Sequence, residues 1–246
     1  MKEKGRATDV RLDRLEAIRK AHPDNTVKMM IGSDESYLRG VYPKLKEALS
    51  EIDGTELSYE RDAEGNEFSP ALSGAEKVSD WGESYFSYVL FFVGLVDEQY
   101  RYLCETVVPD EDGEERQVEG KGMIGCMVAV SLLAPYALLE LRSLERYKGG
   151  DQATPEIDHP VYSLEGEPIE MKVHFRETMG EEAVEALQKT SERIEAILKS
   201  AGISILPEED EEKPVGWLQA GEGVLVGPEH TGKEVTVKEA FFFRGR

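Results

Sequence analysis

A run of 17 residues without a charged side chain, Met123 to Leu139, is the sequence feature that most constrains the fold. A helix that crosses a membrane needs about 20 apolar residues, and this run is shorter and contains a glycine and a proline. We therefore expect it in the interior of a folded core. Leucines continue at amphipathic spacing beyond it, which predicts a long buried helix over 123–147, kinked at Pro135.

The rest of the chain predicts helices and strands in alternation. The other predicted helices are 8–21, a helix from the N-cap Ser33 to Gly54 that is kinked or split at Pro43, and 180–201, ended by Gly202. The predicted strands are 56–61 with a return strand from 67, an aromatic hairpin of 85–95 and 99–108, the alternating strand 169–176, and short strands within 203–206 and 217–243. The expected fold class is α+β, with antiparallel sheets packed against a few long helices.

A segment rich in glycine and proline, about 148–160, is the best candidate for a linker. It divides the chain into an N-terminal α+β region, 1–147, with the aromatic hairpin and the buried helix, and a C-terminal α+β region, 161–246. These two αβ halves can share one continuous core.

Charge restricts the partners that the chain can bind. Fifty acidic and 29 basic residues give a net charge of −21, and the acidic excess is spread over both halves. Broad contact with nucleic-acid phosphates or with anionic membranes is therefore disfavoured. A basic protein partner is favoured electrostatically, although solubility or a salty cytoplasm is the simpler explanation of the charge.

The cysteines and the N-terminus predict free thiols and a cytoplasmic location. Cys104 and Cys126 are too few for a disulfide scaffold and lie in largely apolar segments, so we expect two buried free thiols. The first residues lack the apolar core of a signal peptide, which predicts a cytoplasmic protein.

Motifs for cofactors and metals are weak or missing. Residues 120–125 match the letters Gly-x-Gly-x-x-Gly, but a charged segment precedes them where a strand is required, so we interpret them as a turn that feeds the helix 123–147. The four histidines show no ligand spacing, and the acidic runs lack the full set of calcium ligands. We expect no cofactor and no metal, and the missing motifs favour a non-catalytic protein while leaving an enzyme as the alternative.

Two groups of residues are candidates for a site. The candidates for partner binding are Asp110, Glu111 and Asp112 in one predicted loop, Glu208, Glu209 and Asp210 in another, and the tyrosines Tyr88, Tyr100 and Tyr102 of the hairpin. An alternative site is the polar face of the strand 169–176, which carries Glu170, His174 and Arg176.

Three functional hypotheses follow. The first is a non-catalytic acidic protein that engages or neutralises a basic protein, in the manner of an immunity protein or an inhibitor. The second is an enzyme whose site is assembled from scattered residues on the His174 strand face. The third is an interaction subunit of a larger complex that uses the aromatic hairpin as its interface.

Overall fold

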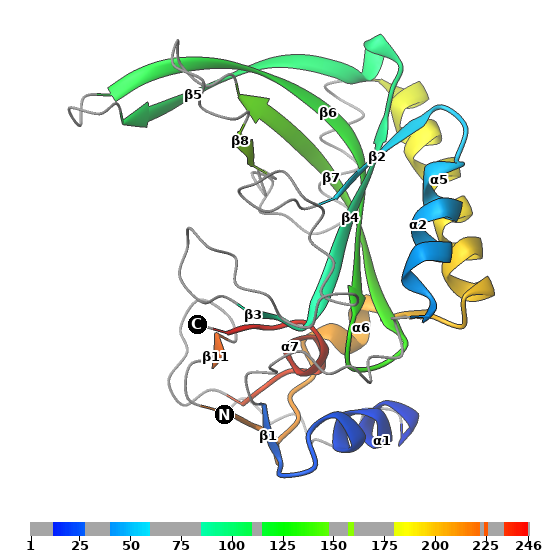
Figure 1. Ribbon diagram of the computed structural model, residues 1–246, viewed down its shortest axis with the longest axis vertical. Helices are drawn as coiled ribbons and strands as arrows, with labels where there is room; N and C mark the ends of the chain where they lie inside the picture. Colours follow the sequence, from blue (N-terminus) through cyan, green and yellow to red (C-terminus); the bar gives the residue numbers. More distant parts are fainter. Residues whose placement is uncertain are drawn as a thin grey trace, which may run out of the picture.

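A long, curved antiparallel sheet organises the fold, with two helices along one face and a group of shorter elements at one end (Figure 1). The computed structural model describes residues 12–27, 40–59, 85–109, 115–147, 157–159, 180–221, 224–225 and 234–245. Strands of the main sheet follow the order β2 (Thr55–Tyr59), β4 (Tyr88–Leu95), β6 (Glu115–Ser131), β7 (Tyr136–Tyr147) and β8 (Ile157–His159). In addition, β5 (Arg101–Pro109) pairs with β6, and β9 (Ser204–Ile205) pairs in parallel with β7. Helices packed on this sheet confirm the predicted α+β class.

The predicted helix over 123–147 is wrong, because this segment forms strands β6 and β7 of an antiparallel pair. The Cα register runs from Gly120↔Tyr147 to Val130↔Ala137, and Pro135 lies in the short connection between the strands. Successive side chains of β6 enter two different hydrophobic clusters, one on each face of the sheet. The sequence of a strand that is buried on both faces is a continuous apolar run. Periodicity alone cannot distinguish such a run from a buried helix.

The predicted aromatic hairpin is also wrong in its pairing. Its two strands, β4 and β5, do not pair with each other; both pair with β6, β4 as far as Gly94↔Gly125 and β5 from Arg101↔Met123 onward. They are consecutive segments along one neighbour, separated by the 3-10 helix η2 (Glu98–Tyr100). Part of the segment predicted as a loop, 109–122, is strand, because β5 pairs with β6 up to Pro109↔Glu115.

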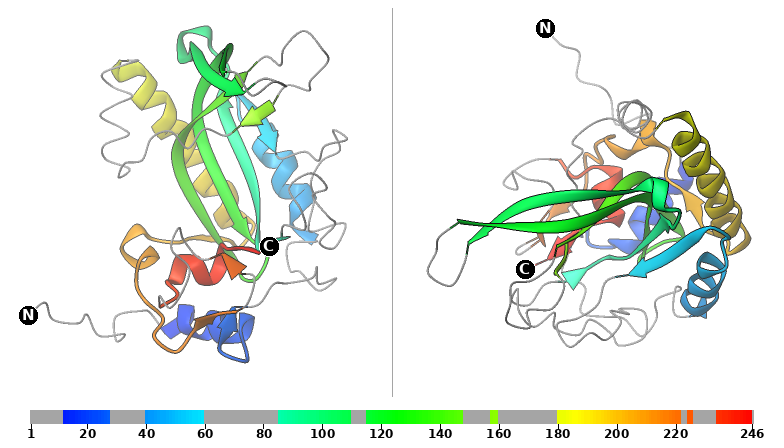
Figure 2. Two further views of the ribbon diagram at one scale, coloured as in Figure 1. Left: turned by 90° about the vertical axis from the view of Figure 1, so that its left-hand side faces the viewer. Right: turned by 90° about the horizontal axis from the view of Figure 1, so that it is seen from above.

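Two helices, α2 (Tyr42–Ser50) and α5 (Glu181–Ser200), cover one face of the sheet (Figure 2). They enclose a first hydrophobic cluster with alternate residues of β4, β6 and β7. Phe91 lies in this cluster and stacks on Tyr42, with ring centroids 5.5 Å apart. A second cluster on the opposite face is closed by α1 (Leu12–Ala21) and α7 (Val237–Phe241) at one end of the sheet.

Two small sheets join the ends of the chain. Strand β1 (Thr26–Val27) pairs in parallel with β10 (Gln219–Ala220), and β12 (Arg244–Gly245) lies between β11 (Val224–Leu225) and β3 (Tyr85–Phe86). The buried hydroxyls of Ser87 and Ser131 both donate to the carbonyl of Phe241, each at 3.0 Å. These bonds fix the C-terminal segment to the ends of the central strands β4 and β6.

The other predicted helices agree with the structure where their residues are described. Helix α1 ends at Ala21, before His22 and Pro23, and α5 covers almost the whole of the predicted 180–201. Helix α2 begins at Tyr42 with Pro43 in its first turn, so the proline starts this helix. Residues 28–39, with the predicted N-cap Ser33, lie outside the described residues.

Two short segments near the C-terminus differ from the prediction. The acidic segment predicted as a loop forms helix α6 (Glu208–Glu211), and the last predicted strand, 234–243, is wrong because helix α7 occupies its centre. A capping box starts α7: Thr236 accepts from the backbone of Glu239, and the carboxylate of Glu239 accepts from the backbone of Thr236. Helix α7 buries Val237, Ala240 and Phe241 in the second cluster, whereas α6 buries only Asp210.

Both hydrophobic clusters combine residues from the two sides of the predicted linker, since α5 belongs to the first and residues 206–243 contribute to the second. Strand β8, from within the predicted linker, pairs with β7. The return strand from 67 and the strand 169–176 lie outside the described residues, and the division into two regions stays a prediction. In the part of the chain that the structure describes, none of the helices has the length and apolar character needed to cross a membrane.

Candidate functional site

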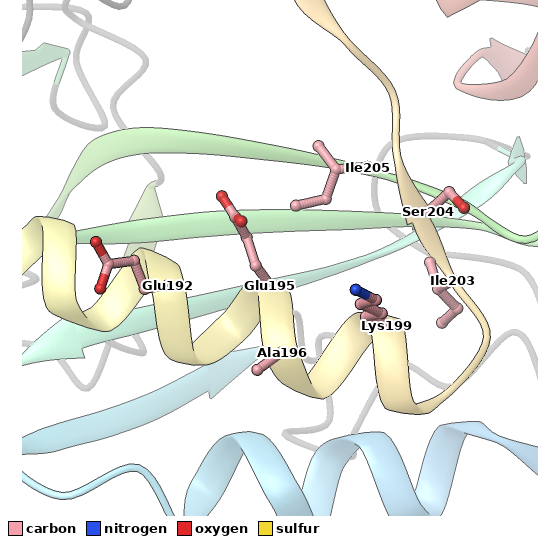
Figure 3. Close-up of a pocket in the computed structure, with 7 residues that line it drawn as sticks. All are labelled: Glu192, Glu195, Ala196, Lys199, Ile203, Ser204 and Ile205. Atoms are coloured by element: carbon pink, nitrogen blue, oxygen red, sulfur yellow. The ribbon is translucent and has the colours of Figure 1, made fainter.

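A groove lies between the C-terminal half of α5 and strand β9 (Figure 3). It is open to solvent and has a volume of about 500 Å³. Its lining consists of charged residues from the helix and mainly apolar residues from the chain that follows it: Glu192, Glu195, Ala196, Lys199, Ile203, Ser204 and Ile205.

The end of α5 determines the shape of this groove. Gly202 has a φ of 76°, a conformation that glycine adopts without strain. Its N–H donates to the carbonyl of Lys199 at 3.1 Å, and the N–H of Ile203 donates to that of Leu198 at 2.9 Å, which together make a Schellman motif. The chain therefore reverses, and Ser204 and Ile205 run beside the last turns of α5 and pair with β7.

The helix contributes the charge. Glu192, Glu195 and Lys199 are three and four residues apart, so they share the face of α5 that borders the groove (Figure 3). All three side chains are exposed, and Glu192 accepts a hydrogen bond of 3.3 Å from Gln188. Among the described residues, Glu195 forms no ion pair. The groove thus combines an apolar floor with two accessible carboxylates.

Sequence reasoning missed this groove although it predicted both of its walls. The helix 180–201 and the short strand after Gly202 were both expected. The spacing of Glu192, Glu195 and Lys199 marks a polar helix face, but such a face is usually only solvated. The signal that distinguishes it is the reversal at Gly202, which places the strand beside that face.

The predicted acidic loop near the C-terminus divides into exposed and buried carboxylates. Glu208 and Glu209 are exposed, as a binding role requires. Asp210 is only 3% exposed, and its carboxylate forms ion pairs with the buried Arg14 of α1 and with Lys213. Asp210 is therefore not on an open surface, since α6 turns it inward against α1. Asp110, Glu111 and Asp112 lie outside the described residues.

A second ionic cluster connects α6 and α7 to the sheet. The Nζ of Lys238 lies 2.8 Å from Glu211 and 3.4 Å from Glu140, and Glu140 also pairs with Arg142 at 2.7 Å. Burial raises the pKa of Glu211, whereas its contact with Lys238 opposes that rise. Burial lowers the pKa of Lys238, but the two carboxylates outweigh burial and the net pKa is raised. These opposite charges neutralise one another, so the cluster links structural elements.

The three candidate tyrosines are only partly accessible. Tyr88 is half-buried, with its ring 6.1 Å from that of Phe242. Tyr100 and Tyr102 pack against the first hydrophobic cluster. The ring of Tyr102 lies over Gly122, where an added Cβ would come within 2.2 Å of it. These tyrosines contribute mainly to packing, and they do not form one exposed patch with the groove.

The interpretation of residues 120–125 as a turn before a helix is wrong, because these glycines lie inside strand β6. At Gly122 a Cβ would collide with the ring of Tyr102, and at Gly125 it would collide first with the backbone carbonyl of Val93, so the first glycine makes room for aromatic packing and the second for the close approach of β4. The alternative site residues Glu170, His174 and Arg176 lie outside the described residues. Among the residues that are described, no group of three histidine, cysteine or acidic side chains could hold a metal ion.

Cys126 is the buried free thiol that the sequence predicts, whereas the side chain of Cys104 is not described. Burial raises the pKa of the Cys126 thiol to about 12. At neutral pH this thiol is protonated and therefore a poor nucleophile. We expect a Cys104→Ser variant to resist a small aromatic disulfide reagent in the native state and to react at once in concentrated urea. Rapid labelling of that native variant at pH 7 would contradict the buried position of Cys126.

Searches among family models, curated proteins and solved structures found no match for this chain.

Proposed function

We propose that this chain is a non-catalytic acidic binding protein that engages or neutralises a basic protein partner, as an immunity protein or an inhibitor does. The observation that carries the proposal is the groove between α5 and β9, in which exposed carboxylates border an apolar floor. The docking surface consists of this groove and the exposed carboxylates of Glu208 and Glu209, which follow β9 by only a few residues.

The chemistry of the groove suits a lysine or arginine side chain. Such side chains lay their methylene stems on apolar surface and keep the charged end in a polar environment. The partly exposed Ile205 and the exposed Ala196 offer the apolar surface, and Glu192 and Glu195 offer carboxylates to an ammonium or guanidinium group. A guanidinium that bridges both carboxylates would be held more firmly than an ammonium, because its planar fork provides several donors.

The charge of the whole chain supports the same kind of partner. A net charge of −21 attracts a basic protein over long distances and raises the rate of encounter. This attraction is screened beyond about 8 Å at physiological ionic strength. Association with the partner is therefore expected to slow steeply as salt is raised, while dissociation, which depends on short-range contacts, changes less.

The test compares two double variants with the same change in net charge. Glu192→Lys/Glu195→Lys reverses the groove, and Glu47→Lys/Glu51→Lys reverses two exposed carboxylates at α2. The two variants and the wild type are each immobilised and then incubated with lysate from the cells of origin. The proteins that each one retains are quantified by mass spectrometry. We expect one basic protein to be retained by the wild type and the α2 variant and lost from the groove variant.

The association rate with that partner is then measured by surface plasmon resonance. The groove variant should associate roughly tenfold more slowly than the α2 variant, because a local attraction becomes a repulsion. Equal rates for the two variants would show that net charge alone determines the encounter and would reject the groove as the docking surface. This comparison does not involve the predicted loop acids Asp110, Glu111 and Asp112, because residues 110–114 lie outside the described residues.

The two other hypotheses have less support. An enzyme site on the face of 169–176 depends on residues outside the described part of the chain. An interface built on the tyrosines 88, 100 and 102 is weakened by their packing against the hydrophobic clusters. Both remain proposals without an observation that favours them over the groove.

A further inference from the structure

The outer edge of strand β9 is an open part of the groove wall. On its inner side β9 pairs in parallel with β7. The N–H of Ser204 donates to the carbonyl of Pro135 at 2.9 Å. Further along the strand, the N–H of Leu206 donates to the carbonyl of Ala137 at 2.8 Å. Because the backbone groups of successive strand residues point to opposite edges, the N–H and the C=O of Ile205 point away from β7.

These two groups of Ile205 have no hydrogen-bond partner in the part of the chain that the structure describes. The residue is partly exposed and lines a groove that is open to solvent. Such an edge can accept one more strand, since main-chain hydrogen bonds form whatever the sequence of the added segment. Pro207 has no N–H, so Ile205 carries the last donor of this edge.

The opposite wall of the groove determines which side chain an added segment would carry. Glu192 and Glu195 line the groove from α5, and in Figure 3 the side chain of Glu195 projects into the same space as that of Ile205. Lys199 is the one cation among the described lining residues, so two carboxylates against one ammonium leave a net charge of −1. This wall therefore favours a positively charged side chain.

The side chain of Ile205 packs against the first hydrophobic cluster, on the face of the sheet that α5 covers. In an added strand, the residue directly opposite Ile205 has its side chain on this same face. That side chain then lies between the strand edge and α5, where Glu192 and Glu195 can contact it. Backbone pairing and charge pairing thus fit one segment at the same time.

We propose that the groove binds an extended segment of the basic partner, which pairs with the outer edge of β9 and places an arginine against Glu192 and Glu195. This inference rests on the proposed function and names the form in which the partner presents its positive charge. Hydrogen bonds to the N–H and the C=O of Ile205 fix the register of the segment, and every second side chain of the segment faces α5. A segment in which arginine alternates with a small polar residue therefore fits this groove.

A first experiment separates the N–H of Ile205 from its side chain. Ile205→Pro removes the outward donor and leaves both bonds to β7, because proline is tolerated where its N–H would face solvent. Ile205→Ala is the matched control, since it keeps the N–H and also shortens the side chain. The probe is a fluorophore-labelled peptide, Thr-Arg-Thr-Arg-Thr, titrated by fluorescence anisotropy. We expect Ile205→Ala to bind this peptide roughly fivefold more tightly than Ile205→Pro, because the proline lacks one main-chain hydrogen bond.

A second experiment keeps the wild-type protein and alters the backbone of the peptide. One peptide is N-methylated on both arginines, and the other on the last two threonines. The donors of successive strand residues point to opposite edges, so only one of these two sets can face β9. We expect one methylated peptide to bind as the unmethylated peptide does, and the other at least roughly fivefold more weakly. This comparison decides the question even if Ile205→Pro does not fold.

The charge variants of the proposed function locate the binding site of the peptide. Glu192→Lys/Glu195→Lys should lose binding of the unmethylated peptide, whereas Glu47→Lys/Glu51→Lys should keep it. Equal loss in the two variants would mean that only the net charge attracts the peptide, and it would overturn the proposal.

Failure of this inference can be distinguished from failure of the proposed function. Strand pairing is overturned if the wild type does not bind the unmethylated peptide up to about 1 mM, or if the two methylated peptides bind equally. It is also overturned if folded Ile205→Pro and Ile205→Ala retain the basic protein from lysate equally, and in that case the acidic groove still stands. The proposed function fails instead when the wild type retains no basic protein from lysate.

Discussion

Replacing Val130 by aspartate is expected to leave no folded, soluble protein. Val130 is fully buried in the first hydrophobic cluster, between Val89 of β4 and Ala137 of β7 in the register. A carboxylate there loses its hydration, and no described cation lies among the cluster residues. An unpaired buried charge of this kind costs more than about 4 kcal/mol, a large part of the stability of a domain.

Val96→Asp is the matched control for this variant. Val96 follows β4 and is 37% exposed, so the same substitution there keeps its charge in water. We expect Val96→Asp to remain soluble, with a free energy of unfolding within about 1 kcal/mol of the wild type. The yields of soluble protein and the circular dichroism spectra of the two variants are compared directly. Equal yields would mean that the segment 123–139 is not in the core.

Replacing Asp210 by asparagine is expected to have the second largest effect. Asp210 is 3% exposed and is ion-paired with Arg14, which is itself 5% exposed, so the substitution leaves a buried guanidinium without its counter-charge. Removal of one partner of a buried ion pair typically costs about 3–5 kcal/mol. The free energy of unfolding, measured by urea titration, should fall by this amount, because α1 and α6 are then held together less firmly.

The neighbouring Glu209→Gln variant removes the same charge from an exposed position of the same helix. Its free energy of unfolding should stay within about 0.5 kcal/mol of the wild type. A second variant, Arg14→Met/Asp210→Leu, replaces both charges by apolar groups and should be less destabilised than Asp210→Asn. If Asp210→Asn and Glu209→Gln unfold at the same urea concentration, α6 is a solvated acidic segment. Its contact with Arg14 then contributes nothing to the free energy of unfolding.

Strand and helix predictions succeeded where one face of an element is polar. Helices α1 and α5 each present charged residues to solvent and apolar residues to the core, so the helical period is visible in the sequence. The same reasoning failed for β6, because both of its faces are buried and the period of two disappears. Pro135 was a real signal, but it marks the connection between two strands rather than a kink in a helix.

In the candidate site, too, some properties could be predicted from the sequence and others depend on contacts between distant residues. Exposed acids such as Glu208 and Glu209 were predicted from composition, but Asp210, one residue further, is buried because α6 turns it toward Arg14, nearly 200 residues away in the sequence. The groove was not predicted, since its two walls come together only when the Schellman turn at Gly202 brings β9 beside α5. The segments 110–114 and 160–179, which hold other predicted residues, lie outside the described part of the chain.

The sequence by itself determined the α+β class, the amphipathic helices, the ends of these helices at glycine or proline, and the net charge of −21. These properties depend on local backbone preferences and on composition, which are present in every stretch of the chain. Only the tertiary structure decided that 123–147 is a strand pair, that β4 and β5 share one neighbour, and which carboxylates remain accessible. Those outcomes depend on contacts between residues far apart in the sequence, because long-range pairing and burial override weak local preferences.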